Sequence, residues 1–166
     1  MPFHRMRSRR SGFTLLEMIV VITITGVMAS IAILAFSTVH GRLGARSAQD
    51  NFLSMHAQAR AFAVERGRTV RLILDTAEDR LRIEWTGPDG AETLSELDLG
   101  QEFDVNMTLE AGSTTAPGIV CFTPRGIAEP GCGTVTTRTR VRFTRGTRAD
   151  GVREVELLPF GQARGL

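Results

Sequence analysis

Residues 11–36 read SGFTLLEMIVVITITGVMASIAILAF, and this stretch decides how the chain is built. From Phe13 to Phe36 it holds 24 consecutive residues with a single charge, that of Glu17. A helix of this length rises about 36 Å, which is enough to cross the ~30 Å hydrocarbon core of a bilayer. The sequence therefore predicts a membrane-spanning helix over residues 13–36.

The residues before this stretch are basic. Four arginines lie within residues 1–12, namely Arg5, Arg7, Arg9 and Arg10. Because positive charge stays on the cytoplasmic side, we expect a cytoplasmic N-terminus with the rest of the chain across the membrane. A cleaved secretory signal is the rival interpretation, with Ser30-Ile31-Ala32 as its cleavage site. The apolar run exceeds the 7–15 residues of such signals, which favours the spanning helix.

Glu17 is the one costly residue of the span. A carboxylate at the centre of a membrane costs about 2.5–3.5 kcal/mol on the lenient insertion scale, and less near the interface. One interpretation is a tolerated interfacial carboxylate. The other is a carboxylate that finds a cationic partner within the membrane.

The order of a basic leader, Gly12, Phe13, Glu17 and a long apolar helix resembles the signal of type IV prepilins and type II secretion pseudopilins. The resemblance implies that residues 1–12 are a leader, cut off after Gly12 by a prepilin peptidase on the cytoplasmic face. It also implies N-methylation of Phe13. By the same resemblance, Glu17 is expected to act in assembly by pairing with the freed amino group of a neighbouring subunit.

A helical pattern continues beyond the span. Small and apolar side chains recur there at steps of three and four residues: Ala45, Ala48, Phe52, Met55, Ala59, Phe62 and Ala63. Gly67 is a typical stop signal. We therefore expect residues 37–66 to be an amphipathic continuation of the helix, with its apolar stripe in the core of the exported head, residues 67–166.

The head has the alternation of apolar and polar residues that is typical of strands. Six segments show it or are apolar enough to be strands: Val70–Leu74, Leu81–Trp85, Phe103–Leu109, Ile119–Phe122, Val135–Phe143 and Glu154–Leu158. Gly87-Pro88-Asp89-Gly90 is a strong turn signal. One long helix followed by strands predicts an α+β fold, with the helix packed on a C-terminal antiparallel sheet.

Parts of the head are similar to the GspH/FimT pseudopilin domain, which has a pilin-like fold. The similar segments are Ala57–Ala63, Thr69–Leu72, Trp85 and Cys121–Gly126. The terminal Gly161–Arg164 resembles the closing Gly-Arg-x-Arg of that family, with Gln162 in place of its first arginine. The resemblance covers nearly the whole chain.

Cys121 and Cys132 are the only cysteines, and they bracket ten residues that are rich in Pro and Gly. An oxidising compartment favours a disulfide between them. Two free thiols or a shared metal are the alternatives, although zinc would need further ligands close by. We predict the disulfide.

Metal binding and catalysis have little support in the sequence. Three carboxylates of one turn are oxygen ligands of the kind that calcium takes, but their spacing matches no calcium loop: Asp75, Glu78 and Asp79. None of the three histidines lies in a catalytic motif. We therefore expect no metal, no cofactor and no enzyme activity.

Arg138, Arg140 and Arg142 share one face of a predicted strand because they are two residues apart. This basic stripe has three interpretations. It aids solubility and blocks pairing between sheets, it docks on the acidic stretch 75–110 of a neighbouring subunit, or it binds DNA phosphates. DNA is disfavoured because aromatic residues are scarce around the stripe and the chain without its leader has a net charge of −2.

The resemblance implies a minor pseudopilin of the type II secretion system, a structural subunit near the tip of the periplasmic pseudopilus. We expect a single-pass inner-membrane protein with a periplasmic head, whose partners are the prepilin peptidase and other major and minor pseudopilins. One alternative is a FimT-like minor type IV pilin that binds DNA for natural transformation. Another is an anchored periplasmic binding or enzymatic domain.

Overall fold

The computed structural model describes residues 13–87, 90–110, 117–129, 131–135, 137–146 and 151–166, without the side chains of 33–42 and 86. The chain divides into two compact units, residues 1–38 and 39–166. The first contains the beginning of helix α1 (Leu15–Arg66). The second contains the remainder of α1 and all the other elements described below.

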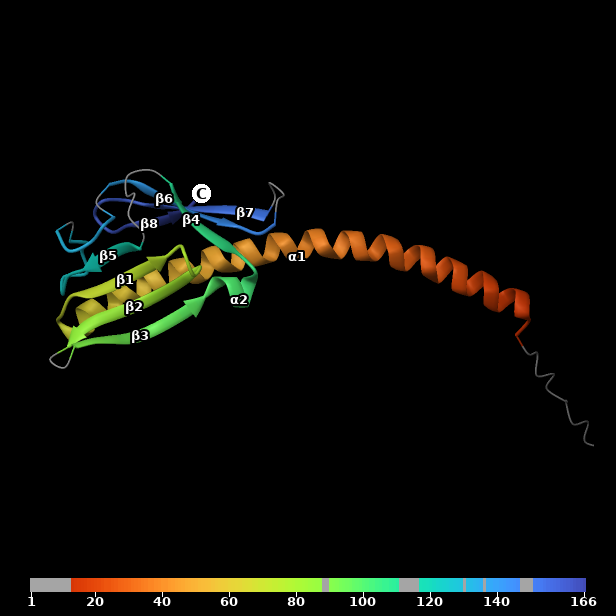
Figure 1. The fold of residues 1–166 in the computed structure, drawn as a ribbon, viewed down its shortest axis with the longest axis horizontal. Coiled ribbons are helices and arrows are strands. Elements are labelled where there is room, and N and C mark those ends of the chain that lie inside the picture. The colour runs from red at the N-terminus through yellow and green to blue at the C-terminus, as the bar shows by residue number, and fades with distance from the viewer. Residues whose placement is uncertain (1–12, 88–89, 111–116, 130, 136, 147–150) are drawn as a thin grey trace, which may run out of the picture. The chain divides into compact units, whose positions relative to one another are not determined.

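The second unit has two antiparallel sheets of four strands each (Figure 1). Sheet 1 has the order β3-β2-β1-β5, in which β1 is Val70–Asp75, β2 is Arg80–Gly87, β3 is Gly90–Asp98 and β5 is Gly118–Phe122. Sheet 2 has the order β4-β6-β7-β8, in which β4 is Asn106–Glu110, β6 is Thr139–Thr144, β7 is Val152–Leu157 and β8 is Ala163–Gly165. Helix α2 (Leu99–Phe103) connects β3 to β4. The predicted α+β class is confirmed, with the strands divided between two sheets.

Helix α1 ends where the sequence predicts. Its last residue is Arg66, and Gly67 has a φ of +62°, a conformation that residues other than glycine rarely adopt. The predicted apolar stripe is buried at Ala45, Ala48, Phe52, Met55, Ala59 and Ala63, while Phe62 is half-buried. The periodicity of the sequence therefore located the face of the helix that meets the head.

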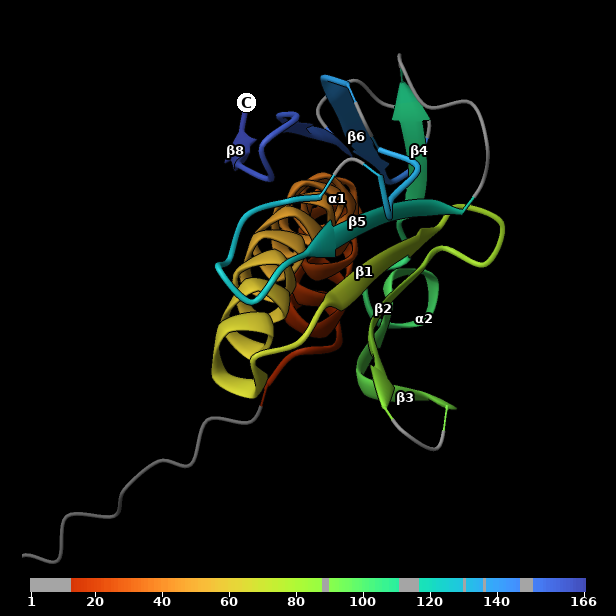
Figure 2. The ribbon, with the colours of Figure 1, turned by 90° about the vertical axis from the view of Figure 1, so that its left-hand side faces the viewer.

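Within the second unit, α1 packs against both sheets (Figure 2). The ring of Phe52 lies 5.6 Å from that of Phe143 on β6. One turn later, the ring of His56 lies 5.1 Å from that of Phe122 on β5. The buried hydrophobic residues of the described chain all lie between Ala45 and Leu157. The second unit therefore has a core of its own.

Two strand boundaries differ from the prediction. Phe103 ends helix α2 instead of beginning a strand, because the Asp98 carboxylate caps that helix by accepting the N–H of Gln101 at 2.8 Å. Strand β6 begins at Thr139 rather than at Val135. The N–H of Val135 instead donates to the carbonyl of Ile119 on β5, at 3.1 Å.

Strands β3 and β8 and helix α2 were not expected from the sequence. Strand β3 is mostly exposed and polar, so it lacks the alternation that marks a half-buried strand. Gly87 pairs with Gly90 at the start of β3, and the register shifts by one residue between Ile83 and Glu84 of β2. The two central residues of the predicted turn, 88 and 89, lie outside the described residues.

Candidate functional sites in the N-terminal segment and the head

The beginning of α1 is capped by a side chain. Oγ1 of Thr14 accepts a hydrogen bond from the backbone N–H of Glu17 at 3.2 Å, which is the geometry of an N-cap residue and the third helical position. Glu17 lies in the first turn, where the helix dipole favours a negative charge. Phe13 precedes the cap and is exposed. The predicted cleavage residue Gly12 lies outside the described residues.

The segment Leu15–Ala32 is long and apolar enough to cross a membrane, with a mean hydropathy of 2.2. Every side chain from residue 13 to residue 32 is exposed. Three hydroxyls in this segment donate to carbonyls one turn earlier at 2.7–2.9 Å: Thr23 to Val20, Thr25 to Val21 and Ser30 to Gly26. Because unpaired polar groups are costly in hydrocarbon, these bonds make the hydroxyls compatible with a membrane.

In the head, Cys121 of β5 and Cys132 form a disulfide. The loop between them turns back at Gly126, whose φ of +71° places it in the left-handed region. The N–H of Glu129 then donates to the carbonyl of Cys121 at 2.9 Å. The disulfide therefore fastens a loop that runs along the outer edge of β5.

The residues after the disulfide continue this cover. The carbonyl of Ile119 accepts the N–H groups of Thr134 and Val135, at 3.0 and 3.1 Å. The N–H of Ile119 donates to Oγ1 of Thr134 at 2.7 Å. An uncovered edge strand invites pairing with another chain, so this loop protects β5 from such pairing.

The predicted basic stripe is largely neutralised within the chain. Arg142 pairs with Glu110 of β4 and with Glu154 of β7, and the hydrogen bond to Glu154 raises the pKa of Arg142. Arg138 lies 3.3 Å from Glu156. Within the described part of the chain, Arg140 is the member of the stripe without a carboxylate partner. The stripe is therefore a cross-strand ion-pair network in which Arg140 remains open to a partner.

Glu156 of β7 is the most buried carboxylate among the described residues, with an exposure of 2%. Nε of Arg164 on β8 donates to its Oε2 at 2.7 Å, and Arg138 approaches its other oxygen. A buried carboxylate is costly unless it is paired. Arg164, which lies in the segment that resembles the closing motif of the family, therefore pairs with Glu156. The sequence alone did not predict this ion pair.

The acidic turn between β1 and β2 uses its carboxylates inside the protein. Oδ1 of Asp75 accepts two backbone N–H groups of the same turn. Glu78 pairs with Arg80 at 3.2 Å, and Asp79 accepts the N–H of Met107 at 2.6 Å. The turn is therefore explained by protein contacts, and the calcium alternative gains no support.

His56 of α1 is buried. Burial, helped by the charge of Arg60, lowers the pKa of His56 to about 4, although a hydrogen bond to the backbone of Gly161 opposes this shift. The histidine is therefore neutral at pH 7. Its ring packs against Phe122 edge to face, which is the environment of a core residue.

A group of arginines surrounds Trp85 of β2 at the end of α1. The guanidinium carbon of Arg66 lies 5.0 Å from the centre of the indole ring, and that of Arg68 lies 5.8 Å from it. The indole N–H donates to Glu92 of β3 at 2.6 Å. Both distances lie within the range of cation–π attraction.

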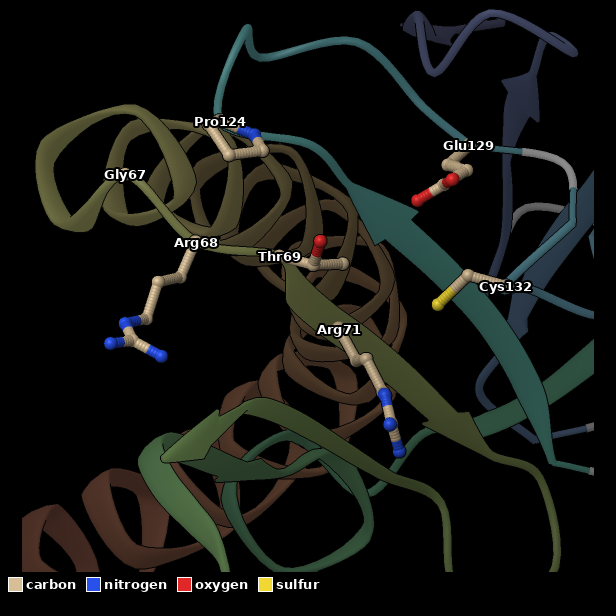
Figure 3. Close-up of a pocket in the computed structure, with 7 residues that line it drawn as sticks. All are labelled: Gly67, Arg68, Thr69, Arg71, Pro124, Glu129 and Cys132. Carbon is tan, nitrogen blue, oxygen red and sulfur yellow. The ribbon is translucent and has the colours of Figure 1, made fainter. Parts of the chain in front are cut away.

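An open groove of about 480 Å³ adjoins these arginines (Figure 3). It is lined by Gly67, Arg68, Thr69, Arg71, Pro124, Glu129 and Cys132. From the sequence, Trp85 was identified only by its resemblance to the family, and its contacts with Arg66 and Arg68 were not predicted. These contacts join the end of helix α1 to β2, and no local spacing in the sequence indicates such a pairing.

Comparisons with known proteins agree with this geometry. Residues 7–33 match the prokaryotic N-terminal methylation motif. No curated protein matches the chain in sequence. The chain is similar in structure to the minor pseudopilin EpsH from the type 2 secretion system of Vibrio cholerae, with 17% identity, a TM-score of 0.56, and coverage of 74% of this chain and 95% of that one.

It is equally similar to the type IV minor pilin FimU of Pseudomonas aeruginosa, with 18% identity, a TM-score of 0.56, and coverage of 75% and 90%. The motif and the architecture together define a pilin-like protein. Its fold is that of the minor pseudopilins and type IV minor pilins.

Proposed function

We propose that this chain is a minor pseudopilin of the GspH type, a structural and non-enzymatic subunit that is incorporated near the tip of the type II secretion pseudopilus. The observation that carries the proposal is a methylation motif followed by a head with the fold of EpsH. In this proposal the apolar part of α1 holds the subunit in the inner membrane, with the arginine-rich leader in the cytoplasm and the head in the periplasm.

Processing at the N-terminus follows from the same proposal. The prepilin peptidase removes residues 1–12, and Phe13 becomes the methylated first residue. The intact mass of protein extracted from membranes tests this step directly. We expect a chain that begins with N-methyl-Phe13, and a start near Ile33 or an uncut Met1 would contradict the pilin assignment.

Glu17 is proposed to attract the free amino group of a neighbouring subunit during assembly. The structure also gives it a local role, since an acid in the first helical turn contributes about 0.3–1 kcal/mol through the helix dipole. Glu17→Gln keeps the length of the side chain and removes the charge on which both roles depend, so processing is measured beside incorporation to show that the helix still forms and inserts. We expect normal processing but poor incorporation into filaments, with Met18→Ala as the neighbouring control. If Glu17→Gln is incorporated normally, the carboxylate has no role in assembly.

The second candidate is a FimT-like minor type IV pilin that binds DNA. The equal similarity to FimU, a type IV minor pilin, supports the pilus part of this candidate. Deletion of the gene, scored in parallel for enzyme secretion and for DNA uptake, separates the two functions. Binding of the head, residues 39–166, to duplex DNA is a second test. We expect no salt-sensitive complex, because the carboxylates beside Arg138 and Arg142 compete with phosphate.

A further inference from the structure

A second groove of the head, with a volume of about 610 Å³, lies between helix α1 and strand β8. It is lined on the α1 side by Leu53, His56, Ala57 and Arg60, and on the other side by Leu158, Gly161, Gln162, Ala163 and Arg164. Figure 2 shows β8 at the outer side of sheet 2, beside α1. None of the residues that line this groove is acidic. We call it the β8 groove.

The outer edge of β8 has backbone groups that sheet 2 does not use. β8 is an edge strand and pairs with β7 alone. The N–H of Leu158 donates to the carbonyl of Gln162 at 2.8 Å, and the N–H of Leu166 donates to the carbonyl of Glu154 at 3.0 Å. Because hydrogen-bonded and non-hydrogen-bonded pairs alternate along an antiparallel ladder, the N–H and the carbonyl of Ala163 point away from β7. Ala163 lines the groove, so these groups are open to an extended chain there.

His56 adds an unpaired acceptor to the wall of the groove. Its side chain is 7% exposed, and its Nε2 has no hydrogen-bond partner among the described residues. The hydrogen bond to the backbone of Gly161 raises the pKa of His56 against the effect of burial, so the ring is the donor in that bond. A neutral imidazole has one N–H, which leaves Nε2 as an acceptor. A buried acceptor without a partner is costly, and a ligand that donates an N–H or O–H to Nε2 would remove that cost.

Arg60 gives the groove its charge. It is exposed and has no carboxylate partner among the described residues. Its side chain lies against the loop closed by the disulfide, since a side chain at Gly126 would come within 3.1 Å of Nε of Arg60. Arg164, by contrast, is paired with the buried carboxylate of Glu156. One uncompensated positive charge beside apolar walls fits a carboxylate that has an apolar neighbour.

We propose that the β8 groove binds an extended segment of another protein chain, which adds to β8 as a strand and carries a carboxylate beside apolar side chains. In strand addition, backbone hydrogen bonds provide affinity and side-chain pockets provide specificity. A donor of the segment meets Nε2 of His56, and its carboxylate pairs with Arg60. Its apolar side chains contact Leu53 and Ala57. Phe160, which is 75% exposed in the turn before β8, offers a further apolar contact.

A nucleic acid fits this groove less well than a peptide does. Its phosphates are bound through several cations, whereas Glu156 offsets the charge of Arg164 and leaves Arg60 as the unpaired cation of the lining. The free edge of a strand also matches the backbone of a peptide. β8 has only three residues, so few backbone bonds can form, and we expect a weak complex that is sensitive to each side chain.

Titration of the isotopically labelled head, residues 39–166, with a designed peptide tests the proposal by NMR, since this unit has its own core. The probe is an acetylated and amidated heptapeptide, Thr-Val-Thr-Glu-Thr-Val-Thr. Residues two apart share one face of a strand, so a valine and the glutamate face α1 together in either direction of binding. We expect saturable shifts confined to the amides of residues 53–60 and 161–164. The peptide with glutamine for glutamate should bind about fivefold more weakly, and a fully N-methylated peptide should not bind.

Variants of the head test the two side chains that define the ligand. Arg60→Glu should weaken binding of the glutamate peptide about tenfold and that of the glutamine peptide less than about twofold. Arg66→Glu is the matched control, because it makes the same change of charge at an exposed position of the same helix outside the groove, and it should leave binding within about twofold. His56→Phe keeps a ring but removes the acceptor, so it should weaken both peptides about fivefold. Urea unfolding shows whether this variant of a buried residue is folded.

Three results would overturn the proposal: no binding at millimolar peptide, equal binding of the glutamate and glutamine peptides, or shifts that lie elsewhere in the head. Salt-sensitive shifts of the same amides by duplex DNA, in a head that ignores the peptide, would assign the groove to a nucleic acid instead. Binding at this groove depends only on the head. A chain that is cut before Phe13 but does not bind the peptide would therefore refute the groove and leave the pseudopilin assignment standing.

Discussion

Oδ1 of Asp79, in the turn between β1 and β2, accepts the backbone N–H of Met107 at 2.6 Å. Its other carboxylate oxygen accepts the side-chain amide of Asn106 at 3.0 Å. A turn that joins two strands of sheet 1 thus bonds to β4, the first strand of sheet 2. Asp79 also has a φ of +51°, a conformation that aspartate and asparagine tolerate better than alanine does.

Asp79→Ala should lower the free energy of unfolding of the head by about 2–3 kcal/mol, because it leaves the N–H of the buried Met107 without a partner and strains the turn. Asp79→Asn keeps an acceptor and the turn conformation, so it should cost about 1 kcal/mol or less. Urea unfolding of residues 39–166 measures both. Equal losses for the two variants would contradict the role of the hydrogen bond, and exposed Glu78→Ala serves as the control.

Arg164→Ala should destabilise the head by about 2 kcal/mol, since it leaves the buried carboxylate of Glu156 with Arg138 as its remaining partner. Arg140→Ala is the comparison on the same sheet and should change stability by less than about 0.5 kcal/mol. A double-mutant cycle with Glu156→Gln tests the cause. The loss at Arg164 should be smaller once the charge at position 156 is gone, and additive losses would show that the two residues are not coupled.

Loss of the disulfide should cost about 3 kcal/mol in the chain-entropy treatment of a loop of this length. The Cys121→Ala/Cys132→Ala head should unfold at lower denaturant concentration than the wild type. Reductant should shift the wild-type midpoint towards that of the variant, because Cys132 is exposed. A wild-type midpoint that is insensitive to reductant would contradict a stabilising bridge.

The lowered pKa of His56 predicts that the head loses stability on mild acidification. Its pKa is about 4 in the folded head and about 6.5 in the unfolded chain, so only the unfolded state gains a proton as the pH falls between these values. The stabilisation is fully present above pH 6.5 and is lost as the pH falls towards 4. Between pH 7 and pH 5 the wild type should lose about 2 kcal/mol more than His56→Leu does. Equal pH profiles of urea unfolding would contradict the shift.

The sequence predicted the elements that follow from a periodic pattern. The stripe from Ala45 to Ala63 located the buried face of α1, and alternation located β1 and β2. Polar β3 and the three residues of β8 carry no such pattern, and their place depends on partners that only the folded sheet supplies. Capping by Asp98 likewise converted the start of an expected strand into α2.

Charged contacts were harder to predict because they depend on the order of strands rather than on spacing. Three arginines two residues apart predicted a basic face. However, the carboxylates of Glu110, Glu154 and Glu156 reach them only because β6 lies between β4 and β7. The position of Arg66 and Arg68 over Trp85 similarly requires the end of a helix to meet the second strand.

The loop closed by the disulfide between Cys121 and Cys132 also affects how readily the head aggregates as it folds. In a reducing compartment the two thiols remain unbonded, and the loop is held over the edge of β5 by hydrogen bonds alone. A head that folds in such a compartment would thus have a less securely covered edge strand, which is a template for aggregation. Formation of the disulfide removes this hazard, so the soluble yield of the recombinant head should be higher in an oxidising compartment than in a reducing one.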